Sequence, residues 1–203
     1  FGRAGPVSRS SEDTPMKRIA ISALLLAPAL FYLHGQERNA KMPAKDLKYT
    51  EAAYFTVTLP RGWERRESTF GLSAKEKKVF GVEVYGPANG DNIFSMISVH
   101  YYAPGNIVHK TYEKFIKRNI QSALGANIDG KQYGKLKNGE VGGRGAKLFE
   151  RITYEYIPPE SIKQKKVPVY GHFAVVPVKA GFYVLEYYAP KDIAKTNIKA
   201  FEG

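Results

Sequence analysis

The fold is decided by residues 55–63, which read Phe-Thr-Val-Thr-Leu-Pro-Arg-Gly-Trp. Apolar and hydroxyl side chains alternate in the first five positions, which is typical of a strand with one buried face. A proline and a glycine then end the strand, and the only tryptophan of the chain, Trp63, follows the turn. A second strand is predicted in residues 181–190, which read Gly-Phe-Tyr-Val-Leu-Glu-Tyr-Tyr-Ala-Pro. The two segments indicate the first and last strands of one domain.

The residues between these two segments alternate between strand-like and helical patterns. An apolar period of three to four residues predicts a helix over residues 110–124, and Pro190 predicts the start of a final helix. Runs rich in β-branched and aromatic residues predict strands at residues 78–85, 93–102, 146–157, 170–178 and 182–188. Tight turns between consecutive strands indicate antiparallel pairing. The sequence therefore predicts an α+β fold, in which helices pack on an antiparallel β-sheet.

Three glycine-containing segments are predicted to be turns. Residues 86–91 would join two antiparallel strands, and Asn138-Gly139 has the composition of a hairpin turn. Gly142-Gly143-Arg144-Gly145 is similar in composition to a phosphate-binding loop, but it precedes a strand and lacks the Gly-Lys-Ser/Thr ending. We expect a turn or a β-bulge there.

The N-terminal region has the pattern of an export signal. Two basic residues precede an apolar run at residues 19–33, which is shorter than the ~20 residues that a membrane-spanning helix needs. We expect residues 16–35 to be a signal peptide or an uncleaved anchor and residues 36–48 to be a flexible tether. A buried helix is the alternative, although the run is apolar on all sides. Residues 1–15 are expected to be a non-native upstream extension.

The composition and spacing exclude several kinds of chemical site. The chain has no cysteine, so disulfides, thiolate metal sites and a cysteine nucleophile are excluded. Its four histidines show none of the close spacings that place two imidazoles on one metal. Glu150 and Glu155 lie an odd number of positions apart on one predicted strand, so their side chains would point to opposite faces. The sequence predicts no catalytic residues, no cofactor site and no metal site.

The chain is basic, with a net charge of +12, and most of this charge lies beyond residue 35. Such an excess favours acidic partners, namely an acidic protein, an anionic membrane surface or nucleic acid; solubility alone is the competing explanation. The densest clusters fall in two predicted loops, residues 75–78 and 161–167. The candidate binding residues are Lys75, Lys77, Lys78, Lys163, Lys165 and Lys166.

The order of these features resembles the PsbP-like superfamily, which includes an extrinsic photosystem II subunit, a Ran-binding protein and exported bacterial proteins. The resemblance rests on Phe-x-Val-x-Leu-Pro-x-Gly-Trp at residues 55–63, Gly-Phe-Tyr-Val-Leu-x-Tyr at residues 181–187, and the closing Ala-Pro helix. It covers residues 49–203 and implies an α/β/α sandwich that is truncated at its C-terminus. It also implies binding of other proteins rather than catalysis, and it carries over no functional residues.

We therefore expect an exported, non-catalytic binding or accessory protein of the cell envelope that acts through protein–protein contacts. Its location would be periplasmic or otherwise extracytoplasmic, and its partner would be an acidic protein or an anionic membrane surface. Two alternatives stay open. One is an enzyme whose site is assembled from distant residues such as Glu83, His100 and Glu186. The other is a nucleic-acid-binding module, against which the export signal argues.

Overall fold

The computed structural model describes residues 47–67, 71–120, 131–157 and 165–202. The expected upstream extension, the signal segment, most of the expected tether and Lys163 lie outside the described residues. Residues 36–203 form one compact unit, and both hydrophobic cores described below belong to it.

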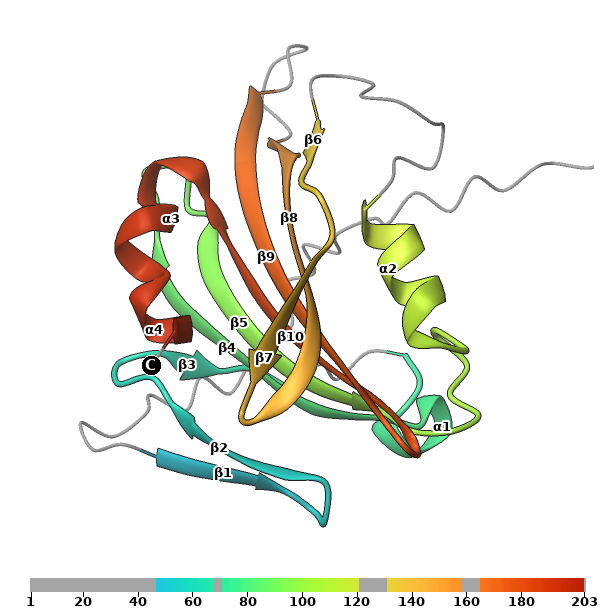
Figure 1. Cartoon of the computed structure of the whole chain (residues 1–203). Coiled ribbons are helices and arrows are strands. Elements are labelled where there is room, and N and C mark those ends of the chain that lie inside the picture. Colours follow the sequence, from blue (N-terminus) through green and yellow to red (C-terminus); the bar gives the residue numbers. More distant parts are fainter. Residues whose placement is uncertain (1–46, 68–70, 121–130, 158–164, 203) are drawn as a thin grey trace, which may run out of the picture. The chain divides into compact units, whose positions relative to one another are not determined.

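Antiparallel strands account for most of the described residues (Figure 1). Eight of them form one sheet in the order β3-β4-β5-β10-β9-β8-β6, and β7 also pairs with β8. Two further strands, β1 and β2, form a separate two-stranded sheet. The strands are β1 (Leu47–Glu51), β2 (Phe55–Leu59), β3 (Glu64–Arg65), β4 (Val79–Ala88), β5 (Phe94–Tyr102), β6 (Gln132–Tyr133), β7 (Lys137–Val141), β8 (Arg144–Ile157), β9 (Lys165–Val178) and β10 (Gly181–Pro190).

Side chains of the central strand β10 alternate between the two faces of the large sheet. Phe182 and Val184 belong to the hydrophobic core on one face, whereas Tyr187 and Ala189 belong to the core on the other. The two faces are therefore both apolar in their centre. This pattern is typical of a strand that is covered on both sides.

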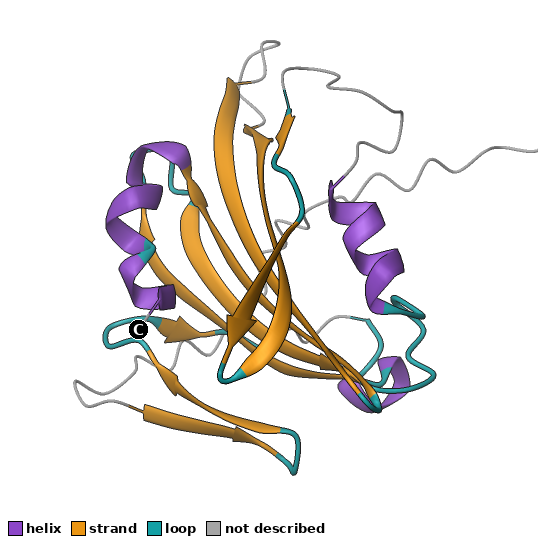
Figure 2. Ribbon diagram, in the orientation of Figure 1, coloured by secondary structure: helices purple, strands orange, loops and turns teal. Residues whose placement is uncertain are grey.

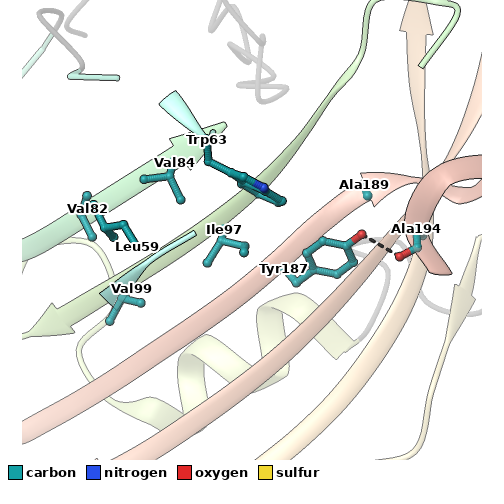
Figure 3. Packing of buried hydrophobic residues seen from close by; sticks show 9 residues of the cluster. All are labelled: Leu59, Trp63, Val82, Val84, Ile97, Val99, Tyr187, Ala189 and Ala194. Atoms are coloured by element: carbon teal, nitrogen blue, oxygen red, sulfur yellow. Dashed lines mark hydrogen bonds between the residues drawn. The ribbon is translucent and has the colours of Figure 1, made fainter. Parts of the chain in front are cut away.

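The first core joins the large sheet to β2 and to α3 (Lys191–Asn197), as Figure 3 shows. The hydroxyl of Tyr187 donates a hydrogen bond to the carbonyl oxygen of Ala194, at 2.7 Å. Trp63 is buried against the backbone of β4. A Cβ at Gly86 would lie only 2.4 Å from the indole ring, so only glycine lets the ring lie this close.

The second core lies beneath α2 (Tyr112–Ile120). Phe115 and Ile116 are the buried residues of this helix, and the exposed residues opposite them include its basic ones. They pack on aromatic side chains of the sheet, among which Phe149 and Phe173 stack with ring centroids 4.6 Å apart. The predicted helix over residues 110–124 is thus confirmed in its centre, and its last positions lie outside the described residues.

The expectation of an α/β/α sandwich is wrong, because the fold is dominated by the sheet and the helices are few and short (Figure 2). Besides α2 and α3, the described residues include the one-turn helices α1 (Ala74–Lys77) and α4 (Lys199–Glu202). The nine residues of α2 span only about 14 Å. The 14-residue strands β8 and β9 run for about 45 Å, so such helices cannot cover the sheet as layers. None of the described helices is long and apolar enough to cross a membrane.

Two local expectations also need correction. Asn138 and Gly139 lie inside β7 and not at a turn: they pair with Lys147 and Ala146 of β8, and the side chain of Leu148 covers Gly139. The hairpin turn falls instead at Gly142 and Gly143, both with positive φ, which confirms the turn expected there. Strand β1 also takes up Leu47 and Lys48, which we had assigned to the tether.

Candidate functional site

The candidate lysines form two groups that lie at opposite ends of the large sheet. Lys75, Lys77 and Lys78 lie on and just after α1, beside the first residue of β4. Lys165 and Lys166 begin β9, whose other end turns into β10 next to the α1 end of the sheet. Along β9 the separation is roughly 40 Å. The two groups therefore cannot form one compact binding surface.

Lys165 and Lys166 have partners within the protein. Lys165 forms an ion pair with Asp91, and the ammonium of Lys166 lies 4.1 Å from the ring centre of Tyr154. Both residues are in a strand rather than in the loop expected from the sequence. They line a cavity of about 190 Å3 together with Asn89, Asp91, Val167, Pro168 and Asp192. The acidic groups in this lining offset its lysines, so it is a poor match for an acidic partner.

Lys75, Lys77 and Lys78 differ in that no carboxylate among the described residues forms an ion pair with them. They belong to a helical turn, where we had expected a loop. Ser73 and Glu76 form a capping box at its start: the Ser73 backbone N–H donates to the Glu76 carboxylate at 2.8 Å, and the Glu76 N–H donates to the Ser73 hydroxyl. Lys78 ends the turn in the left-handed conformation, with φ of 55°. A capped turn holds the lysine backbones in fixed positions.

A loop of apolar character lies directly beside α1. The backbone N–H of Ala103 donates to the carbonyl of Lys78 at 3.0 Å, and that of Ile107 donates to the carbonyl of Lys77 at 3.2 Å. The side chain of Ile107 is 63% exposed and that of Val108 41%. Leu72, just before the helix cap, is 49% exposed. Exposed apolar side chains and lysines thus lie together at the α1 end of the large sheet.

The loop owes its shape to the buried side chain of Asn106. Its amide donates to the carbonyl of Ala103 at 3.0 Å, and its side-chain oxygen accepts from the backbone N–H of His109 at 2.7 Å. His109 in turn packs edge-on against Phe115 of α2, with ring centroids 4.9 Å apart. Burial lowers the pKa of His109, and the charge of Arg118 lowers it further. The contacts of Asn106 and His109 therefore hold the loop in place, while the side chain of Ile107 stays exposed.

A third segment completes this end of the sheet. The hydroxyl of Tyr101 donates to the carbonyl of Ala180 in the β9–β10 turn. This turn lies at the same end of the sheet as α1, as Figure 1 shows. We call this end the basic tip. It consists of Leu72–Lys78 around α1, the loop from Pro104 to Lys110, and the turn Lys179–Ala180. It has five lysines, at positions 75, 77, 78, 110 and 179, against one carboxylate, that of Glu76.

The residues of the enzyme alternative lie on one face of the sheet. Glu83 and Glu186 are both cross-strand neighbours of Ser98, and the imidazole of His100 lies 3.8 Å from the Glu83 carboxylate. Each group has a protein partner: Tyr85 donates to Glu83 at 3.1 Å, and Arg151 lies 3.9 Å from Glu186. These contacts are those of a polar network within the sheet.

The environment of this network shifts its ionisation. Burial raises the pKa of Glu186 to about 7, with Arg151 opposing this rise and Glu83 adding to it. Burial lowers the pKa of His100, which the carboxylate of Glu83 opposes. The guanidinium of Arg151 is held on the far side by the side-chain oxygen of Asn119 in α2, at 2.8 Å. The network therefore connects α2 to the sheet through Arg151. The ionisation of Glu186 within it affects the stability of the fold.

A second polar group lies on the other face. His172 lies 3.7 Å from the carboxylate of Glu150 and 3.3 Å from the hydroxyl of Tyr170. The pKa of Tyr170 is raised, mainly because its side chain is partly buried. Across the described ranges, no cluster of three or more histidine and carboxylate groups has the geometry of a metal site.

Sequence reasoning identified the lysines of α1 but missed the apolar part of the basic tip. Leu72 and Ile107 are far apart in the chain, and neither belongs to a predicted element. The available signal is the pair Ile107-Val108, two β-branched residues in a loop directly after Pro104-Gly105. An apolar pair in a turn region is exposed unless another element covers it.

Comparison with known proteins gives no assignment, because the chain matches no protein-family model and no curated protein. The fold and the basic tip together define a sheet-dominated protein with one basic, partly apolar end.

Proposed function

We propose that this protein is a non-catalytic binding module that recognises an acidic partner at the cell envelope through its basic tip. The observation that supports the proposal most directly is the position of Lys75, Lys77 and Lys78 on a capped turn, where Lys75 and Lys78 are exposed and Lys77 is half-buried. None of the three has an acidic partner among the described residues. Clustered cations of this kind attract an acidic surface over about 10 Å at 0.1 M salt.

The remaining parts of the proposal rest on the sequence. The apolar run after two basic residues favours export, and the resemblance to the PsbP-like superfamily favours protein–protein contacts over catalysis.

The proposal is tested by capture of envelope material on immobilised protein. Residues 36–203 are compared with a variant in which Lys75, Lys77 and Lys78 are all replaced by Glu. The control reverses Lys131, Lys135 and Lys137, on the sheet edge away from α1, and so changes the net charge by the same amount. We expect the first variant to lose the captured material and the control to keep it.

Ionic strength is the second readout of the same experiment. Raising the salt from 0.1 to 1 M shortens the screening length from about 10 to about 3 Å, so capture should fall for the wild-type protein. Equal capture by both charge-reversed variants would contradict the proposal. Capture that depends on added single-stranded nucleic acid would instead support the nucleic-acid-binding alternative.

A further inference from the structure

Exposed aliphatic side chains surround the lysines of the basic tip. Ile107 is the most exposed large hydrophobic residue that the structure describes; Val108 follows it in the loop, and the exposed Leu72 precedes α1. An acidic protein partner needs only the cations. Three exposed aliphatic groups in the same segments favour a partner that accepts apolar side chains as well.

The chemistry of the basic tip differs from that of most protein interfaces. Interface hot spots are enriched in tryptophan, tyrosine and arginine that fill shaped pockets. The described residues of the basic tip have none of these side chains exposed, and its charges are all lysines. Lysines beside aliphatic residues are instead typical of segments that lie at the surface of an anionic bilayer.

The backbone of the loop is already prepared for a water-poor environment. The N–H groups of Asn106, Ile107 and His109 and the carbonyl of Ala103 all have hydrogen-bond partners within the basic tip. An unsatisfied backbone group would cost several kcal/mol in the apolar part of a bilayer. The N–H of Ile107 is therefore already paired when its side chain enters the headgroup region.

The charges are complementary to such a surface. The five lysines of the basic tip lie on three segments that meet at one end of the sheet. The anionic lipids of a membrane attract each nearby basic residue, and the attraction decays within a screening length.

We infer that the basic tip docks on an anionic membrane surface, with Ile107 and Val108 inserted between lipid headgroups and the lysines bound to lipid phosphates. This inference rests on the proposed function and names the partner of the same site. Shallow insertion would position the sheet on the membrane without a spanning segment.

Co-sedimentation with lipid vesicles tests this inference. Residues 36–203 are used, because they hold both cores and lack the apolar run at 19–33, which would bind lipid by itself. The vesicles contain either phosphatidylcholine alone or phosphatidylcholine with 30% phosphatidylglycerol. We expect binding to the anionic vesicles and at least about tenfold weaker binding to the neutral ones, since each lysine near the surface contributes roughly a factor of five.

Point variants separate the apolar from the electrostatic contribution. Ile107→Asp should weaken binding to the anionic vesicles about tenfold or more, through the lost burial of one aliphatic side chain and the added repulsion. The matched control is Leu136→Asp, which changes another exposed aliphatic residue, outside the basic tip and before β7. Ile107→Trp should show blue-shifted emission and quenching by brominated lipid in the anionic vesicles.

Each outcome has a definite meaning. Equal weakening by Ile107→Asp and Leu136→Asp would overturn the inference. Absence of vesicle binding, together with lysine-dependent capture of envelope protein, would also overturn it but leave the proposed function standing with a protein partner. Absence of both would overturn the inference and the proposed function together.

Discussion

At the scale of single residues, the most consequential group is the carboxyl of Glu186. Its side chain is only 21% exposed, on a sheet face where Arg151 is its one cationic neighbour among the described residues. Burial holds its pKa near 7, whereas a carboxyl in the unfolded chain titrates near pH 4.5. A group with a raised folded pKa stabilises the fold fully below its unfolded pKa. That contribution is lost as the pH rises towards the folded pKa.

We therefore predict that the protein loses up to about 3 kcal/mol of unfolding free energy between pH 4.5 and 7.5 because of Glu186. The variant Glu186→Gln should be more stable than the wild type at pH 7.5 and should show a flatter pH dependence. Urea unfolding at several pH values measures both. Glu140→Gln, at an exposed site on β7, is the control and should follow the wild type. A parallel decline of Glu186→Gln and wild type would refute the assignment.

At the scale of elements, the junction of β3 and β4 depends on the absence of a side chain at Gly86. The indole of Trp63 occupies the space in which a Cβ would lie. At Gly90, in the β4–β5 turn, a Cβ would meet no atom within 4 Å. Alanine substitutions at Gly86 and Gly90 therefore separate the effect of side-chain packing from the effect of backbone conformation.

Gly86→Ala is predicted to destabilise the protein by roughly 1–3 kcal/mol, because the indole or the strand must move to make room. Gly90→Ala should change stability by less than about 1 kcal/mol. Chemical unfolding of both variants gives the comparison, and near-ultraviolet circular dichroism reports on the indole. Similar losses of unfolding free energy in the two variants would show that the close contact between Gly86 and Trp63 is not needed for stability.

The elements also show what local sequence determines and what it does not. The strand at residues 55–59 follows from its alternation alone, and the centre of α2 follows from its apolar period. The start of β9 was missed because Pro168, which pairs with Tyr154, looks like a strand break. Strand β1 has too few apolar residues to be recognised, and it exists because β2 pairs with it. The prediction of helical layers on both faces was wrong because an apolar period locates a helix but does not show how much of the sheet that helix covers.

The sequence predicted only the part of the candidate site whose charged residues are close together in the chain. The lysines of α1 are adjacent in the sequence, so they could be found. The approach of Leu72, Ile107 and Lys179 depends on the antiparallel register of four strands, and no local pattern specifies it. Register also explains why Glu83 and Glu186 become neighbours of the same serine.

At the scale of the whole molecule, two hydrophobic cores share one sheet. Strand β10 contributes Val184 to one core and Tyr187 to the other, so neither core can form without the same central strand. A domain built in this way should unfold as one unit.

We predict that Val84→Ala in the first core and Val175→Ala in the second each lower the unfolding free energy by roughly 1–3 kcal/mol. Both should shift a single transition without changing its denaturant dependence. Far-ultraviolet circular dichroism and tryptophan fluorescence should then give coincident curves for each variant. A second transition, or a variant that moves only one of the two signals, would show that the cores unfold separately.

The burial of Trp63 also gives the molecule a built-in optical probe. It is the only indole in the chain and is 5% exposed, so its emission should lie at short wavelength in the folded state and shift to the red on unfolding. Because it lies at the end of β4 remote from α1, the colour of this emission should not respond to events at the basic tip. Its fluorescence therefore reports the integrity of the sheet alone, and any spectral change caused by lipid must come from an indole placed at the other end.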